Sequence, residues 1–144
     1  MKKYLFLTLV LFSLTACVSM HGKEDYIPVG PQNLSIKFTD GKDLPLFTHV
    51  TQIKRPWANI GLQRIKHLPD DPKIIEENIV RMKNFAAAHG ADALLIKQYF
   101  DENEKRLPIT LATNLVKYLD DLSMEDEEKI LNFAQTTAAL NEEE

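Results

Sequence analysis

The sequence predicts an α+β domain in which one central helix packs on a small, mostly antiparallel sheet, with a peripheral C-terminal helix. Three observations predict this class. A helical pattern over residues 71–89 ends at Gly90 and leads directly into the apolar run 93–96. Segments on both sides of this unit alternate apolar and polar residues, as strands do. The final segment, residues 120–144, combines a narrow apolar stripe with many acidic residues.

Residues 1–16 are typical of an export signal. Lys2 and Lys3 precede the apolar run 4–14, which is shorter than the about 20 residues that span a bilayer. The ending Leu14-Thr15-Ala16-Cys17 resembles the lipobox of bacterial lipoproteins. That resemblance implies cleavage before Cys17, a diacylglycerol on its sulfur and usually an acyl chain on its new amino group. A plain secretory signal or an uncleaved anchor is the alternative.

A lipid on Cys17 has two consequences for the mature chain. Cys17 is the only cysteine, so no thiol would remain for a disulfide, a redox couple or a metal site. The next residue is Val18. In the enterobacterial lipoproteins that the motif resembles, an aspartate at this position is associated with retention in the inner membrane. Its absence favours an outer-membrane anchor in the cell envelope, with the domain facing the periplasm.

The segment between the anchor and the central helix carries weaker patterns. Residues 17–32 are polar, with two prolines and two glycines, and we expect a lipidated tether there. Alternation at 33–38 predicts the first strand of a domain spanning 33–119, whereas 47–53 is only weakly strand-like. Residues 55–65 alternate more clearly, and Gly61 inside this run indicates a bulge.

The central helix has clear start and stop signals. Asp71 is a suitable N-cap and Pro72 fits the first helical position, where its missing N–H is not needed. Gly90 is suited to the left-handed conformation that ends many helices. The following run, 93–96, is apolar on both faces and predicts a covered strand.

Two elements complete the expected fold. Residues 109–118 alternate, which favours a strand hairpinned onto residues 93–100, although a helix over 115–122 is the alternative. Ser123 is a suitable N-cap with acidic residues in the following turn, where carboxylates favour a helix N-terminus. We therefore expect a peripheral helix and tail over 120–144.

Composition restricts the classes of partner. The chain has 44% hydrophobic and 26% charged residues, as an ordinary globular protein does. Its formal charge is −4, and loss of Lys2 and Lys3 leaves 15 basic and 21 acidic residues, or −6. This acidity argues against a nucleic-acid partner. The acid is concentrated in residues 120–144, where nine acidic residues and one basic residue give −8.

Two linked segments resemble known bacterial families. They are Arg55-Pro56-Trp57 with Ile60-Gly61, and the helix end Ala87-Ala88-His89-Gly90-Ala91-Asp92-Ala93-Leu94-Leu95. Over residues 47–118 the chain resembles the RcsF-type stress-sensing outer-membrane lipoproteins and the YbjQ-type putative heavy-metal-binding domains. The resemblance implies a small α+β domain that contacts other envelope proteins or forms a homo-oligomer. The stress sensors are braced by disulfides, which this single-cysteine chain cannot form.

No pattern in the sequence predicts an enzyme. The four histidines, at positions 21, 49, 67 and 89, lack the spacing of a metal site, and no catalytic motif is present. We therefore expect no catalytic residue, no cofactor and no metal ligand. A non-catalytic protein-binding or stress-sensing module is the first interpretation, and a metal- or small-ligand-binding envelope protein is the alternative.

One segment is a candidate partner-binding surface. Lys54, Arg55, Trp57, Arg64 and Lys66 lie in a stretch without acidic residues. They favour an anionic partner such as an envelope protein, lipid headgroups or lipopolysaccharide, although a solvated strand face is the simpler interpretation. We also expect the acidic C-terminal helix to lie on this segment within the same chain, with Phe133 against Trp57, and to mask it.

Overall fold

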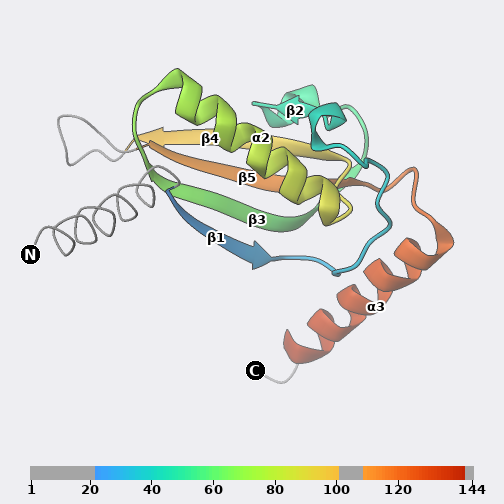
Figure 1. The fold of residues 1–144 in the computed structure, drawn as a ribbon. Helices are drawn as coiled ribbons and strands as arrows, with labels where there is room; N and C mark the ends of the chain where they lie inside the picture. The colour runs from blue at the N-terminus through green and yellow to red at the C-terminus, as the bar shows by residue number, and fades with distance from the viewer. Residues whose placement is uncertain (1–21, 101–108, 142–144) are drawn as a thin grey trace, which may run out of the picture.

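A computed structural model describes residues 22–100 and 109–141 of the chain. They form a five-stranded sheet with helix α2 (Pro72–Ala88) on one face and helix α3 (Met124–Asn141) at one end (Figure 1). The predicted α+β class is confirmed. The strands and short 3-10 helices are β1 (Lys23–Pro28), η1 (Gly41–Asp43), β2 (Leu46–Phe47), η2 (Val50–Gln52), β3 (Trp57–Leu68), β4 (Ala93–Phe100) and β5 (Ile109–Tyr118).

The strand order is β1-β3-β5-β4-β2. Three of the four pairings are antiparallel, and only the short β2 runs parallel to β4. The predicted hairpin of 109–118 on 93–100 is confirmed, with Ala93 opposite Val116 and Phe100 opposite Ile109. The strand over 55–65 is also confirmed, and the register shift between Asn59 and Gly61 is the expected bulge.

Helix α2 begins and ends where its sequence signals predict. The Asp71 carboxylate accepts a hydrogen bond from the Lys73 N–H at 2.9 Å, and Pro72 occupies the first turn. Gly90 has a φ of +79°, so it takes the left-handed conformation that lets the chain turn into β4. A Cβ at this position would lie 2.8 Å from the Leu34 carbonyl oxygen, so the turn also needs glycine for space.

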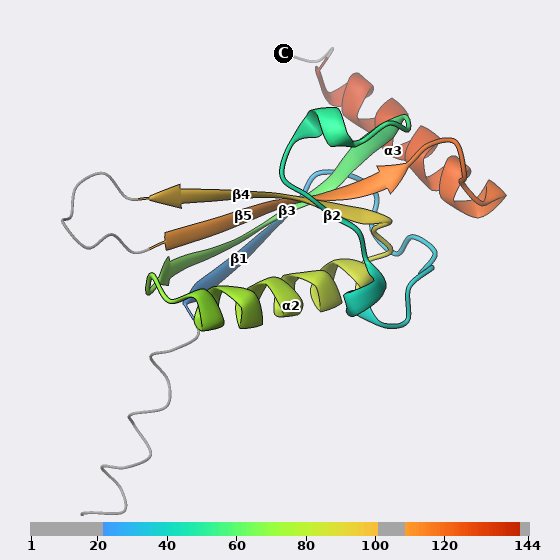
Figure 2. The same ribbon diagram turned by 90° about the horizontal axis from the view of Figure 1, so that it is seen from above.

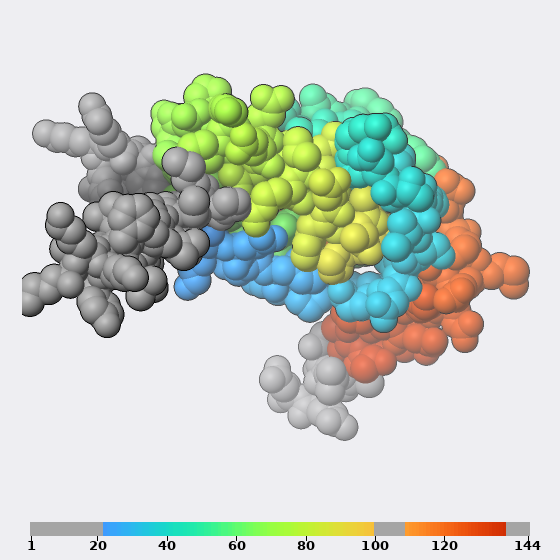
Figure 3. Space-filling view, in the orientation of Figure 1, coloured from blue at the N-terminus to red at the C-terminus, as the bar shows by residue number. Residues whose placement is uncertain are grey.

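Helix α2 and the segment around η1 cover one face of the sheet (Figure 3). The core beneath them takes side chains from every long strand and from the helix. Its fully buried members include Ile65, Met82, Leu94, Leu111 and Leu115. Burying each such side chain contributes about 1.5–3 kcal/mol. This covered face is the main source of the fold's stability.

Among residues 22–100 and 109–141, the segment that packs on the opposite face of the sheet lies at one end of it. There the segment of β2 and η2 folds over β4 and β5 (Figure 2). The buried residues of this second cluster are Ile53, Ala93, Leu95 and Val116, with Phe47, Trp57 and Tyr118 packed around them. Residues 47–53 therefore act mainly as a cover, since only Phe47 among them belongs to a strand.

Two expectations for the N-terminal part of the domain are wrong. Lys23–Pro28, placed in the tether, forms the edge strand β1 and pairs with β3 from Lys66 to Gly61. Residues 33–38, expected as a strand, form no ladder. Leu34 in this segment is buried, but Ile36 is 58% exposed. The Ser35 N–H instead donates to the Asp126 carboxylate at 2.9 Å, so a side chain, and not a neighbouring strand, accepts this backbone hydrogen bond.

Candidate functional site

The structure separates the five residues of the predicted partner-binding surface. Lys54 and Arg55 precede β3, Trp57 begins it, and Arg64 and Lys66 lie near its far end. Trp57 and Lys66 are nine residues apart along one strand, which corresponds to about 30 Å. The two groups therefore cannot contact one small ligand together.

At the first end, Arg55 binds to the segment that connects β5 to α3. Its guanidinium donates to Asp120, with Nη2 2.7 Å from Oδ1, and lies 4.1 Å from the centre of the Tyr118 ring. The hydrogen bond from Arg55 lowers the pKa of Asp120. Trp57 is half-buried in the cluster on the face opposite α2, and no α3 residue belongs to that cluster. That cluster holds only buried and partly buried side chains and Phe133 is exposed, so the expected contact between Trp57 and Phe133 stays a prediction.

At the other end, Arg64 and Lys66 share one carboxylate. Their nitrogens lie 2.9 and 3.0 Å from the Asp25 oxygens, and Asp25 belongs to the neighbouring edge strand β1. The hydrogen bond from Lys66, with a smaller contribution from Arg64, lowers the pKa of Asp25. Two cations on one anion leave a local excess of positive charge at this end of the sheet.

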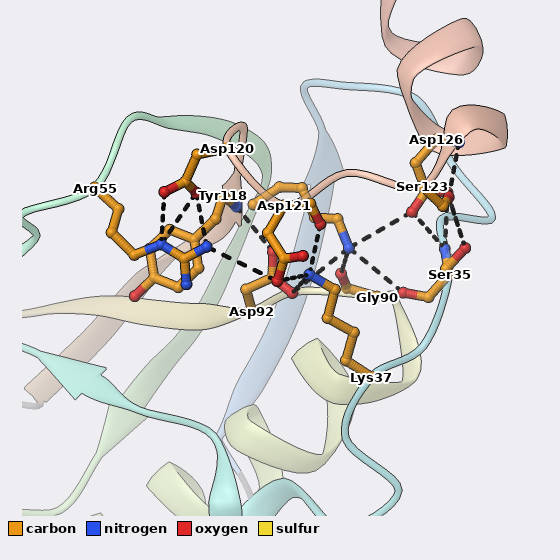
Figure 4. A network of polar contacts seen from close by, with 11 residues as sticks. Ser35, Lys37, Arg55, Gly90, Asp92, Tyr118, Asp120, Asp121, Ser123 and Asp126 are labelled. Carbon is orange, nitrogen blue, oxygen red and sulfur yellow. Dashed lines mark hydrogen bonds and ion pairs between the residues drawn. The ribbon is translucent and has the colours of Figure 1, made fainter.

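Sequence reasoning missed the most deeply buried charged residue, Lys117 of β5. Its side chain is fully buried, and its ammonium group donates to the Gly90 carbonyl oxygen at 2.9 Å and the Ser35 carbonyl oxygen at 3.4 Å. The same nitrogen lies 3.6 Å from Asp92 Oδ1 and 3.8 Å from Asp126 Oδ2. Figure 4 shows these partners: Gly90 and Asp92 belong to the turn after α2, Ser35 to the segment before η1, and Asp126 to α3.

Asp92 links this buried cluster to the surface. Its Oδ2 accepts a hydrogen bond from the Tyr118 N–H at 2.8 Å, and its Oδ1 faces the ammonium groups of Lys37 and Lys117 at 3.5 and 3.6 Å. Lys37 also donates to Asp121, at 3.0 Å from Oδ2. Burial opposes ionisation of Lys37, but its hydrogen bond to Asp121 and the negative charges of Asp92 and Asp121 outweigh burial and raise the pKa of Lys37.

Asp126 attaches α3 to this cluster. It lies in the first turn, where its N–H donates a hydrogen bond to the Ser123 hydroxyl oxygen at 3.1 Å. Its carboxylate receives the Ser35 N–H at 2.9 Å and the Ser35 hydroxyl at 3.2 Å. Burial alone would raise the pKa of Asp126, but the hydrogen bonds from Ser35 and the charge of Lys117 outweigh it and lower the pKa. The N-cap predicted at Ser123 is confirmed.

These contacts give the cluster a structural role. Lys117 is inaccessible to a substrate, and its donors are occupied by backbone carbonyls and carboxylates. The Lys117 ammonium group, on β5, therefore binds to the 33–37 segment, to the turn at Gly90 and to α3. Its contact with Asp126 helps to orient α3. The expected masking of the basic segment by α3 within the chain is wrong, since α3 is anchored through Asp126 and through Lys129, which donates to the Asn33 carbonyl.

The remaining expectations concern metals and membranes. Within residues 22–100 and 109–141, no three His, Cys, Asp or Glu side chains are grouped so as to hold a metal ion. His89 instead stacks on Phe85, with ring centres 4.0 Å apart. Among the described helices, none is both long and apolar enough to span a bilayer. Cys17 and the export signal lie outside the described residues.

A second candidate surface is the part of the sheet, on the side opposite α2, that no other described element covers. We call it the open face (Figure 2). Strand alternation and the cross-strand register assign its members. They are Lys23, Asp25, Ile27, Leu62, Arg64, Lys66, Lys97, Tyr99, Thr110 and Ala112.

Charge and apolar area coincide on the open face. It carries four basic residues and one acidic residue, a formal charge of +3, on a chain that is acidic overall. Ile27 and Tyr99 are 44% and 51% exposed, although both are large and apolar. Within the described residues no helix covers these side chains. The pairing of β1 with β3 brings Lys23 and Asp25 beside Arg64 and Lys66, which the sequence alone did not reveal.

Comparison with known proteins gives limited information. No protein-family model and no curated protein matches the sequence. A solved structure, the crystal structure of a Francisella virulence factor, FvfA, in the orthorhombic form, is similar to this chain with a TM-score of 0.47 and 20% sequence identity. The match covers 64% of this chain and 94% of that chain.

Proposed function

We propose that this chain is a lipid-anchored, non-catalytic envelope protein that binds another protein through the open face. The observation that carries the proposal is the open face itself, where exposed Ile27 and Tyr99 lie among basic side chains. Folding alone does not require this composition, since an exposed sheet face is stable with ordinary polar residues. Apolar side chains bordered by charge are typical of protein-binding surfaces.

The anchor is the second part of the proposal. The ending Leu14-Thr15-Ala16-Cys17 supports lipidation of Cys17, and Val18 supports an outer-membrane location facing the periplasm. Two or more acyl chains make membrane attachment effectively permanent, at about 0.8 kcal/mol per buried CH₂. The domain would then meet its partner while confined to the membrane surface.

Labelling tests the anchor. Cells expressing the full chain are fed a palmitate analogue, and the protein is followed through membrane fractionation. We expect the wild-type chain to be labelled and membrane-bound, and Cys17→Ala to be unlabelled and unprocessed. A Cys17→Ala chain that is still processed and membrane-bound would disprove the lipid anchor.

Photocrosslinking in cells tests the binding surface. A photoreactive amino acid is placed at Tyr99 or Ile27 on the open face, and at Val80 as the control. Val80 is similarly exposed, at 47%, but lies on α2. We expect Tyr99 and Ile27 to capture the same protein and Val80 not to capture it. Absence of adducts from both open-face positions, or equal capture from Val80, would contradict the proposal.

A further inference from the structure

Within the part of the chain that the structure describes, the hydrogen bonds and ion pairs that attach helix α3 to other segments lie near its N-terminus. Asp126 and Lys129 bind to the 33–35 segment and to Lys117. Every residue from 131 to 137 is exposed. These two turns of the helix therefore extend beyond the surface that orients it.

The extended part of α3 carries apolar side chains without a cover. Ile130, Phe133 and Ala134 share one side of the helix by their spacing, and Leu131 borders it. Phe133 is 41% exposed and Leu131 is 55% exposed. Because isolated helices of this length are marginal in water, α3 needs a surface to lie on.

The charge on α3 is opposite to that of the open face. Residues 124–137 contain four acidic residues and one basic residue. Asp126 is paired with Lys117 and Glu125 is paired with Lys129, which leaves Glu127 and Glu128 exposed on the first turns. The open face carries +3 with Ile27, Leu62 and Tyr99 between its basic side chains. An acidic and apolar helix therefore complements a basic and apolar sheet face.

A single chain does not bring the two surfaces together. In Figure 2, α3 lies on the side of the sheet opposite α2, at the end away from the joined ends of β4 and β5. The open face lies toward those joined ends, since Tyr99, Lys97 and Thr110 belong there. The buried contacts of Asp126 hold α3 in this direction.

We propose that two copies of this chain form a twofold dimer in which α3 of each copy lies on the open face of the other. This inference rests on the proposed function, because it names one occupant of the same binding surface. A twofold arrangement uses both surfaces of both copies and leaves neither exposed. Confinement of both copies to one membrane would favour the pairing by raising their local concentration.

The size of such an interface is set by the part of α3 beyond its attached first turns. Residues 130–141 of the helix are about 18 Å long and about 10 Å wide. Two such contacts, each counted on the helix and on the sheet, bury on the order of 700 Å². A stable interface normally exceeds about 1,000 Å², so the pairing should be weak, transient and sensitive to salt.

Crosslinking of purified full-length chains in detergent tests the contact. One tagged copy carries Phe133→Cys, a differently tagged copy carries Tyr99→Cys, and a bifunctional maleimide joins them. The chain with Cys17 alone gives the background, and Val80→Cys replaces Tyr99→Cys in the matched control. We expect a mixed dimer only from the pair at positions 133 and 99. Equal crosslinking with Val80→Cys would overturn the proposal.

Charge reversal measured by sedimentation provides a second, independent test. Lys97→Glu changes an exposed residue, so the fold should persist, which circular dichroism checks. We expect this variant to weaken the dimer roughly fivefold or more, and Lys97→Glu with Glu128→Lys in one chain to restore it. Wild-type chain that sediments as a monomer at all concentrations overturns the dimer. If Tyr99 still captures another protein in cells, the proposed function survives that result.

Discussion

The two faces of the sheet are made of alternate residues from the same strands, yet they have different roles. On the face toward α2, Leu94, Ile65 and Leu115 are fully buried. On the other face, Ile27 and Tyr99 are about half exposed. Charges differ in the same way, because Lys117 beside the covered core is enclosed by carboxylates and carbonyls, whereas Lys97 on the open face is exposed.

This difference shows which residues of the sheet are constrained by folding and which are not. Substitutions on the covered face change packing and buried charge, so its sequence is set by stability. Substitutions on the open face change little that the fold needs. Its combination of basic and apolar residues is therefore better explained by binding than by folding. If so, substitutions on the covered face should change stability, and substitutions on the open face should change binding.

The largest effect is expected from Lys117→Met. The substitution keeps the volume of the side chain but leaves Asp92 and Asp126 buried without their common cation. Breaking a buried charge network in this way costs about 3–5 kcal/mol. Urea unfolding measures the free energy of unfolding, and Lys97→Met on the exposed part of β4 is the matched control, expected within about 0.5 kcal/mol. Equal effects at both lysines would show that the buried network contributes little.

The next effect is expected from Leu115→Ala in the covered core. Leu115 is fully buried in the central strand β5, so truncation removes apolar contact and leaves a cavity. We expect a loss of about 2–5 kcal/mol in the free energy of unfolding. Ile79 is only partly buried on α2, so Ile79→Ala should cost less than Leu115→Ala. The reverse order would contradict the packing described here.

A smaller effect is expected from pH, through Asp126. Its pKa in the folded chain is lowered below its ordinary value of 3.8, so ionised Asp126 stabilises the fold above that pH. This stabilisation should disappear as the pH falls below about 4 through the folded pKa. Asp126→Asn should be less stable than the wild-type chain at pH 7 and should lose less stability between pH 5 and pH 3. The charged group facing Asp126 is Lys117.

Unfolding curves at several pH values check this prediction. The difference between the wild-type chain and Asp126→Asn isolates one carboxylate from the others, such as Asp25 and Asp120, whose pKa values are also lowered. Parallel pH profiles for the two proteins would mean that Asp126 does not hold α3 through its charge.

Local signals in the sequence were enough to predict the central part of the fold. Asp71, Pro72 and Gly90 mark the ends of α2 through their own backbone preferences, and the bulge at Gly61 follows from the same logic. Strand β1 could not be found this way, because the polar run Lys23–Pro28 is stabilised by pairing with β3 rather than by its own pattern. The alternation of Leu34, Ile36 and Phe38 has the pattern of a strand, but no strand pairs with this segment. Its Ser35 N–H binds to the Asp126 side chain instead.

The candidate site was harder to predict than the fold. Arg64 and Lys66 do belong to the open face, but Arg55 and Trp57 contribute to the other end of the molecule. Basic residues that are close in the sequence can lie far apart in space when they belong to one extended strand. Lys117 had a usable signal, because the alternation of Thr113 and Leu115 continues to it and places a lysine on the covered face. A lysine in that position needs buried acids, which here come from Asp92 and Asp126.

The smallest effect on stability is expected from Tyr99→Ala and Ile27→Ala on the open face. Because both side chains already contact water, each truncation should change the free energy of unfolding by no more than about 0.5 kcal/mol. The same truncations should weaken capture of a partner, since exposed apolar anchors supply much of the binding energy of a surface. Val80→Ala on α2 matches their exposure and should affect neither stability nor capture. If Tyr99→Ala were as destabilising as Leu115→Ala, this face would be part of the core, and the distinction between the two faces would fail.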